Sequence, residues 1–176
     1  LTTASNMTCV NAKTGVIVIG QSGDHKGLTE IRMIADGVYN RCSTTYWGYA
    51  KFNGTIAERN IQLGRETISG STNRGTGGYA YDVKLYFRPG AAIDKATGFP
   101  KYTIAVATTG TACIIKETQT GGGDDGATIR NVYSTNAQFR GCAFMPNGRA
   151  VFCNQHVSGS VGTRLHYVKE APNYDS

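Results

Sequence analysis

Charged side chains are scarce in this chain of 176 residues, because Asp, Glu, Lys and Arg together make up only 17% of it. Proline occurs 4 times, and no run of 18 apolar residues is present, so we expect no membrane-spanning helix in the sequence as given. Lys and Arg are scattered, with no run of three, although the net charge is +6. We interpret this charge as a solubility surface, while contact with nucleic acid, anionic glycans or membrane surfaces stays open.

The motifs of common catalytic sites are also missing. No serine lies in a GxSxG motif, and neither an HExxH motif nor a P-loop occurs. The 12 carboxylates are dispersed, and none of the three histidines has neighbours that suggest an acid–base pair: His25, His156 and His166. We therefore expect a protein that is not an enzyme and that has no catalytic residue and no cofactor.

One glycine-rich loop, residues 121–126, carries the adjacent carboxylates Asp124 and Asp125. Neighbouring carboxylates on such a loop are compatible with Ca²⁺ binding. The loop lacks the alternating oxygen ligands of an EF-hand, so we interpret it as an acidic turn. The sequence therefore predicts no metal site.

Glycine (23 residues) and tyrosine (10 residues) are abundant, as are Thr, Ser and Asn. This composition is typical of β-structure with many turns that is exposed outside the cell. The length suits a single β-rich domain over residues 1–176, and no internal repeat or long linker divides it. The start at Leu1, with no basic or apolar leader, indicates a processed product.

Residues 139–153 are predicted to form a β-hairpin, because two apolar runs flank Pro146-Asn147-Gly148. Two registers are possible. If Asn147 and Gly148 form a two-residue turn, Cys142 lies opposite Cys153 and a cross-strand disulfide becomes possible. In that register, however, Pro146 occupies a hydrogen-bonded position and has no N–H to donate.

The second register places Pro146 and Asn147 at the centre of a type I turn, followed by Gly148 in the left-handed conformation. Met145 then faces Arg149, and the two cysteines lie on opposite faces of the hairpin. We favour this register because one face becomes continuously apolar, with Cys142, Phe144, Ala150 and Phe152.

Most of the remaining chain shows the alternation of β-strands. Strands are expected at Met7–Val10, Val16–Ile19, Thr44–Phe52, Asn60–Leu63, Tyr79–Phe87, Lys101–Ala107, Ala112–Lys116, Ile129–Tyr133 and Thr163–Val168. In Tyr79–Phe87 the alternation predicts one buried face and one solvent-exposed face that carries Asp82 and Lys84.

One stretch has a different period. Apolar residues recur at intervals of three and four from Leu28 to Tyr39, which predicts a short helix there. The predicted fold is mainly β: an antiparallel two-sheet sandwich with this one short helix packed on it.

The five cysteines have neither CxxC nor Cys/His spacing, so structural zinc is not expected. Dispersed cysteines in a chain rich in Thr and Asn indicate disulfides in an oxidising compartment. Cys42, just after the predicted helix, is expected to pair first with Cys9. All five are disulfide candidates, and the odd count leaves one buried, free or paired between subunits: Cys9, Cys42, Cys113, Cys142 and Cys153.

Aromatic residues are concentrated in the strand at Thr44–Phe52. Tyr46, Trp47 and Tyr49 are candidates for a stacking platform that binds sugar or bases, and the alternative is a half-buried core strand. The flexible loop at residues 69–78, which contains Arg74, is a candidate to border this platform. These four residues are the candidate ligand-binding residues of the sequence.

The segment Phe144-Met-Pro-Asn-Gly-Arg-Ala150, followed by Cys153, resembles a hairpin late in the globular domain of minor pilins and pseudopilins of the GspH, FimT and FimU type. The strand at Thr163–Val168 resembles a later strand of that domain. The resemblance covers about a sixth of the chain. It implies a β-rich head that a long N-terminal helix carries and that assembles into a surface filament. The Gly-Arg-x-Arg ending associated with DNA binding in the FimT type is missing, which argues against DNA as a partner.

From these observations we predict a non-enzymatic structural subunit of an extracellular filament: a pilus, a pseudopilus or a similar surface assembly. Its partners would be other copies of itself or related filament subunits, at the cell surface or outside the cell. Two alternatives stay open: a secreted lectin-like module that binds glycan, and a secreted hydrolase.

Overall fold

The computed structural model describes residues 6–22, 27–33, 37–42, 49–52, 65–68, 79–95, 98–116, 128–156 and 163–167. These residues form two antiparallel β-sheets, and no helix occurs among them. It follows that no helix in the described part of the chain is suited to crossing a membrane. The prediction of a mainly β fold with two antiparallel sheets is confirmed.

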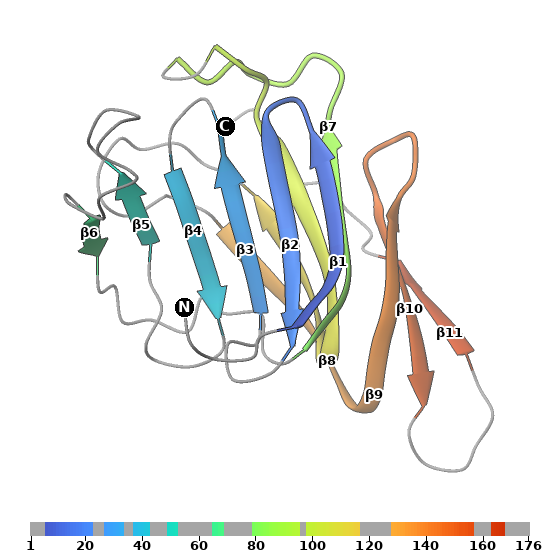
Figure 1. Cartoon of the computed structure of the whole chain (residues 1–176). Helices are drawn as coiled ribbons and strands as arrows, with labels where there is room; N and C mark the ends of the chain where they lie inside the picture. The colour runs from blue at the N-terminus through green and yellow to red at the C-terminus, as the bar shows by residue number, and fades with distance from the viewer. Residues whose placement is uncertain are drawn as a thin grey trace.

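The first sheet has six strands in simple sequential order, each hydrogen-bonded to the next (Figure 1). Strands that follow one another in the sequence commonly pair side by side in an antiparallel sheet, which favours this order. The strands are β1 (Asn6–Lys13), β2 (Val16–Ser22), β3 (Gly27–Arg32), β4 (Gly37–Cys42), β5 (Tyr49–Phe52) and β6 (Arg65–Ile68).

The turn between β1 and β2 is tighter than the sequence suggested. Lys13 pairs with Val16, which leaves Thr14 and Gly15 as a two-residue turn with φ angles of 50° and 73°. Two successive positive φ values match the twist of an antiparallel hairpin. The strands expected at Met7–Val10 and Val16–Ile19 are therefore confirmed, and the first of them continues to Lys13.

The helix predicted from Leu28 to Tyr39 is wrong, because β3 and β4 occupy most of that stretch and pair with each other. In β3, Leu28 and Glu30 are both fully buried, whereas Thr29 and Ile31 on the other face are half-buried. Because the inward residue Glu30 is charged, the two-residue alternation of apolar side chains is not visible in the sequence. Ile31 lies on the opposite face from Leu28, and the interval of three between them resembles the spacing of a helix. The predicted helix on the sheet is thus two strands of the sheet.

The second sheet has five strands in the order β11-β10-β9-β8-β7. Figure 1 shows β10 and β11 lying well apart from the first sheet, beyond β7 and β9. The strands are β7 (Ala80–Phe87), β8 (Tyr102–Lys116), β9 (Thr128–Phe144), β10 (Ala150–His156) and β11 (Thr163–Tyr167).

Strand β8 is continuous where two separate strands were predicted. Residues 108–111, between the two predicted strands, stay in β8, and the register with β9 shifts there: Thr109 pairs with Gln138, whereas Thr111 pairs with Tyr133. The hydroxyl of Thr108 donates to the carbonyl of Thr111 across the bulge at 2.7 Å. This shift disrupts the hydrogen-bond ladder between β8 and β9 over one stretch only, so the strand continues past Gly110.

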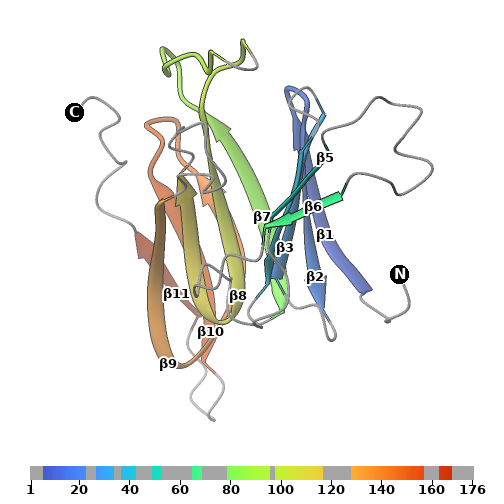
Figure 2. The same ribbon diagram turned by 90° about the vertical axis from the view of Figure 1, so that its left-hand side faces the viewer.

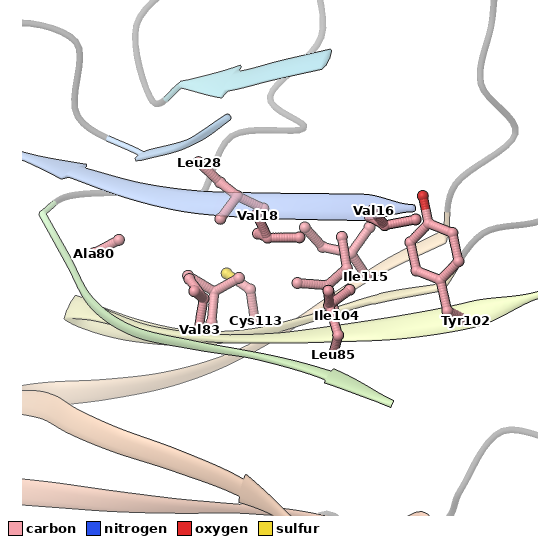
Figure 3. Close-up of a cluster of buried hydrophobic side chains, with 11 residues drawn as sticks. Val16, Val18, Leu28, Ala80, Val83, Leu85, Tyr102, Ile104, Cys113 and Ile115 are labelled. Atoms are coloured by element: carbon pink, nitrogen blue, oxygen red, sulfur yellow. The ribbon is translucent and has the colours of Figure 1, made fainter. Parts of the chain in front are cut away.

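One hydrophobic cluster takes side chains from both sheets, which lie side by side as layers in Figure 2. Figure 3 shows Val16, Val18 and Leu28 of the first sheet pointing toward the apolar side chains of β7 and β8. Each fully buried aliphatic side chain contributes about 1.5–3 kcal/mol. The partners on the second sheet are Ala80, Val83, Leu85, Tyr102, Ile104, Val106, Cys113 and Ile115.

Candidate functional site

The hairpin of β9 and β10 has the second of the two predicted registers. Cys142 pairs with Phe152 and Phe144 pairs with Ala150. At the turn, Gly148 has a φ of 81°, and its N–H donates to the carbonyl of Met145 at 2.8 Å. The prediction of a type I turn followed by a left-handed glycine is confirmed, so Cys142 and Cys153 do not face each other.

The apolar face of this hairpin is buried as predicted. Cys142, Ala150 and Phe152 are 7%, 2% and 0% exposed. They form a second hydrophobic cluster with Phe139 and with β8 residues that face away from the first sheet. The Phe139 and Phe152 rings meet edge to face at 6.2 Å between centroids. The hairpin therefore covers the outer side of β8.

The tip of the hairpin packs on β7 through Tyr86. The rings of Tyr86 and Phe144 are stacked with centroids 5.1 Å apart, and the Tyr86 hydroxyl donates to the carbonyl of Pro146 at 3.1 Å. Gly148 approaches Tyr86 so closely that an added Cβ would lie 2.8 Å from the ring. The absence of a side chain at Gly148 thus allows this contact as well as the turn.

Asp82 connects β7 to the hairpin on the same face. Its carboxylate accepts from the backbone N–H of Cys142 at 3.0 Å, from the N–H of Val83 at 2.9 Å and from the Lys84 ammonium at 2.5 Å. Burial by itself lowers the pKa of Lys84, but the hydrogen bond and charge of Asp82 more than offset this and raise it. The face of Asp82 and Lys84 was predicted to be solvent-exposed; instead it is half-buried beneath the hairpin.

Three β-bulges lie next to one another beside Asp82. The register of β7 shifts at Tyr81, that of β8 shifts between Thr109 and Thr111, and that of β9 shifts at Arg140. The Arg140 guanidinium lies 4.1 Å from the centre of the Tyr81 ring, and the Thr109 hydroxyl donates to the Tyr81 hydroxyl at 3.4 Å. Bulges re-aim side chains and are frequent near functional sites. We call Tyr81, Thr109 and Arg140 the bulge cluster.

A buried charged group joins the two sheets at Glu30. Its side chain is fully buried, and its Oε1 accepts from the Arg32 Nε at 2.7 Å and from the Tyr102 hydroxyl. The Arg32 guanidinium also lies 5.8 Å from the centre of the Tyr102 ring. Glu30 and Arg32 belong to β3 and Tyr102 to β8, so this group links the sheets. No spacing in the sequence brings Glu30 to Tyr102, and sequence reasoning missed the contact.

Four of the five disulfide candidates form no disulfide in the structure: Cys9, Cys113, Cys142 and Cys153. The expected pairing of Cys9 with Cys42 is therefore not formed. Burial raises the pKa of Cys113 to about 12, and burial followed by the charge of Asp82 also raises the pKa of Cys142. The pKa of Cys9 is raised chiefly by burial, although a hydrogen bond with Thr8 opposes this. Cys42 lies in β4, and its side chain is outside the described residues.

These thiols give a direct test of the packing. In the folded protein at pH 8, we expect iodoacetamide to alkylate Cys113 and Cys142 at least about a hundredfold more slowly than in the unfolded chain, because both thiolate formation and access are suppressed. Cys9 and Cys153, which are both half-buried, should react before Cys113 and Cys142. Mass spectrometry of peptides after timed labelling would measure this order. Equal labelling of all sites, or a disulfide involving Cys113 or Cys142, would contradict the structure.

The candidate ligand-binding residues from the sequence lie mostly outside the described residues. Tyr46, Trp47 and Arg74 are not described, and Tyr49 is described only as a backbone position of β5 that pairs with Tyr39 and Ile68. The acidic loop at residues 121–126 is not described either. Within the described parts of the chain, no group of three or more His, Cys, Asp or Glu residues is arranged to hold a metal ion. The sugar or base platform stays a prediction.

Several large apolar side chains are exposed on the surface. On β1, Met7 and Val10 are 74% and 65% exposed, and Val10 pairs with the half-buried Ile19 of β2. On β11, Leu165 is 60% exposed. Single exposed apolar residues are common, but a group on a flat sheet face is a candidate contact surface. No protein-family model and no curated protein matches this chain.

Proposed function

We propose that the chain is a non-enzymatic structural subunit of an extracellular filament, a pilus, pseudopilus or similar surface assembly. In this proposal its two sheets form a β-sandwich, and its partners are other copies of itself or related filament subunits. The observation that carries the proposal is a difference between the two edge strands of the second sheet: β1 covers β7, whereas no described strand covers β11. An edge that a protein leaves open is available to another chain.

The edge at β7 is covered by β1 of the first sheet. The Thr8 hydroxyl donates to the carbonyl of Ala80 at 2.5 Å, and the Asn11 side-chain oxygen accepts from the N–H of Leu85 at 3.3 Å. These contacts occupy backbone groups that an incoming strand would need. β1 therefore protects this edge from pairing with another molecule.

The edge at β11 has no such cover among the described strands, where β10 is its one hydrogen-bonded neighbour. Leu165 in the middle of β11 is 60% exposed. The apolar positions on β1, Met7 and Val10, lie on a different sheet. Two unlike surfaces favour head-to-tail contacts, which produce open filaments rather than closed dimers.

Charge substitutions on these surfaces test the proposal. We expect Leu165→Lys and Val10→Lys each to shift assembly to at least about tenfold higher protein concentration, because each would bury a charge in the subunit contact. Ala92→Lys is the matched control, since it adds the same charge at an exposed position in the loop between β7 and β8. Sedimentation velocity over a concentration series would measure the shift. Assembly that is unchanged in both variants, or lowered equally by the control, would contradict the proposal.

A further inference from the structure

We propose that the bulge cluster of Tyr81, Thr109 and Arg140 binds a saccharide that carries a carboxylate, such as a uronic acid unit. This binding would be separate from assembly, and neither depends on the other. The proposal starts from Arg140, which is exposed and yet held in one place over the Tyr81 ring at 4.1 Å. The cation–π contact fixes the direction of a guanidinium that would otherwise sample many rotamers.

Arg140 has no carboxylate partner in the described parts of the chain, although Asp82 follows directly after Tyr81. Both carboxylate oxygens of Asp82 have other partners: one accepts from Val83 and Lys84, and the other accepts from the Cys142 N–H. Arg140 itself is exposed, and no described carboxylate occupies its planar donors. A guanidinium that is oriented and left without an anion is suited to bidentate binding of a carboxylate.

The groups around Arg140 suit a sugar. The hydroxyls of Tyr81 and Thr109 are hydrogen-bonded to each other at 3.4 Å. Each hydroxyl can also donate to or accept from the hydroxyl groups of a sugar ring. The N–H of Thr109 also donates to the carbonyl of Tyr79, which places the backbone of the 38% exposed Tyr79 beside the cluster. An exposed aromatic ring provides an apolar surface for the C–H face of a sugar.

The charge around the cluster favours a saccharide over nucleic acid. Nucleic-acid binding requires several cations that contact successive phosphates. The nearest other cation on β7, Lys84, is paired with Asp82. One guanidinium with no anionic partner among the described residues, beside aromatic and hydroxyl groups, matches one carboxylate on a sugar better than a phosphate backbone.

The three bulges explain how these side chains come together. A regular β7 would place Tyr81 and Asp82 on opposite faces, whereas the bulge lets Asp82 hold β9 while Tyr81 supports Arg140. The bulge of β9 is the residue Arg140 itself, which leaves the ladder with β10. The irregularities thus produce the site without disturbing the buried cluster beneath it.

Binding of trigalacturonate to the full chain, followed by isothermal titration calorimetry and by NMR, tests the proposal. We expect a Kd of about 1 mM or tighter, with amide shifts centred on Tyr81, Thr109 and Arg140. Arg140→Gln should weaken binding by about tenfold or more, and Arg140→Lys should weaken it less, because lysine keeps the charge and loses the bidentate fork. Arg149→Gln is the matched control: it removes the same charge from an exposed arginine at the hairpin turn, and we expect less than a twofold change.

Three results would overturn the proposal. The first is wild-type binding of trigalacturonate no tighter than binding of neutral maltotriose. The second is an equal loss of affinity in Arg140→Gln and Arg149→Gln, which would show attraction to net charge alone. The third is tighter, Arg140-dependent binding of a 12-nucleotide single-stranded DNA, which would make nucleic acid the ligand. The amide spectra of the variants show whether each remains folded, and the wild-type shift map tests the site even if Arg140→Gln is unstable.

Discussion

Replacing Gly148 with alanine is expected to lower the free energy of unfolding by about 2–4 kcal/mol. Two costs combine at this position. The φ of +81° is unfavourable for any residue with a Cβ, and that Cβ would lie 2.8 Å from the Tyr86 ring. The ring is held by its stacking on Phe144 and by its hydrogen bond to Pro146, so it cannot move away without losing the hairpin contact. Chemical denaturation followed by tryptophan fluorescence would measure the change.

Gly98→Ala is the matched control for this substitution. Gly98 has a φ of +72°, but a Cβ there would meet nothing within 4 Å. The Gly98→Ala variant therefore measures the cost of the positive φ alone, which we expect to be about 1 kcal/mol of unfolding free energy. An equal loss in the two variants would mean that the hairpin tip does not rest on Tyr86, and the account of hairpin docking would be wrong.

Replacing Glu30 with alanine is expected to lower the free energy of unfolding by about 3–5 kcal/mol. The substitution removes the carboxylate to which Arg32 and Tyr102 donate, and the Arg32 side chain, only 12% exposed, would be left largely buried beside a cavity. Because Tyr102 belongs to the opposite sheet, the loss also weakens the contact between the sheets. Urea denaturation monitored by circular dichroism would measure it.

Glu30→Gln provides the comparison. The amide keeps an oxygen that can accept from both donors but removes the charge, so we expect a smaller loss, about half of that of the alanine variant. If both substitutions change stability by less than about 1 kcal/mol, Glu30 is not buried between the sheets and the described register of β3 is incorrect.

The sequence predicted those parts of the fold that depend on neighbouring residues. Pro146, Asn147 and Gly148 specify the hairpin turn because proline fixes one φ and glycine permits the positive one. Once the turn is specified, the pairing of Cys142 with Phe152 follows by counting residues. The same local logic located the alternating strand at β7.

The errors arose where distant contacts decide the structure. The inward carboxylate of Glu30 is satisfied by Arg32 and by Tyr102, and Tyr102 is 72 residues away in the sequence. The register shift at Thr109 leaves no trace in the hydrophobic period, so two strands were predicted where β8 is one. The outer face of β7 resembles a solvent-exposed face because its cover, the hairpin, comes from the other end of the chain.

The same contrast between local and distant contacts applies to the candidate binding residues. The bulge cluster depends on three register shifts and could not be found from spacing, although each of its residues is of a type that binds sugars or anions. The candidates chosen from composition, Tyr46, Trp47, Tyr49 and Arg74, lie close together in the sequence and were found for that reason. They remain predictions alongside the site that the structure brings together.

The most direct test of the proposed function is negative-stain electron microscopy of the protein from its native source, with non-reducing mass spectrometry of the same sample. The account predicts ordered filaments in which the chain is a repeating subunit and in which Cys9, Cys113, Cys142 and Cys153 remain free of disulfides within the subunit. A dispersed monomer at every concentration, with internal disulfides among these cysteines, would contradict both the proposed assembly and the described fold.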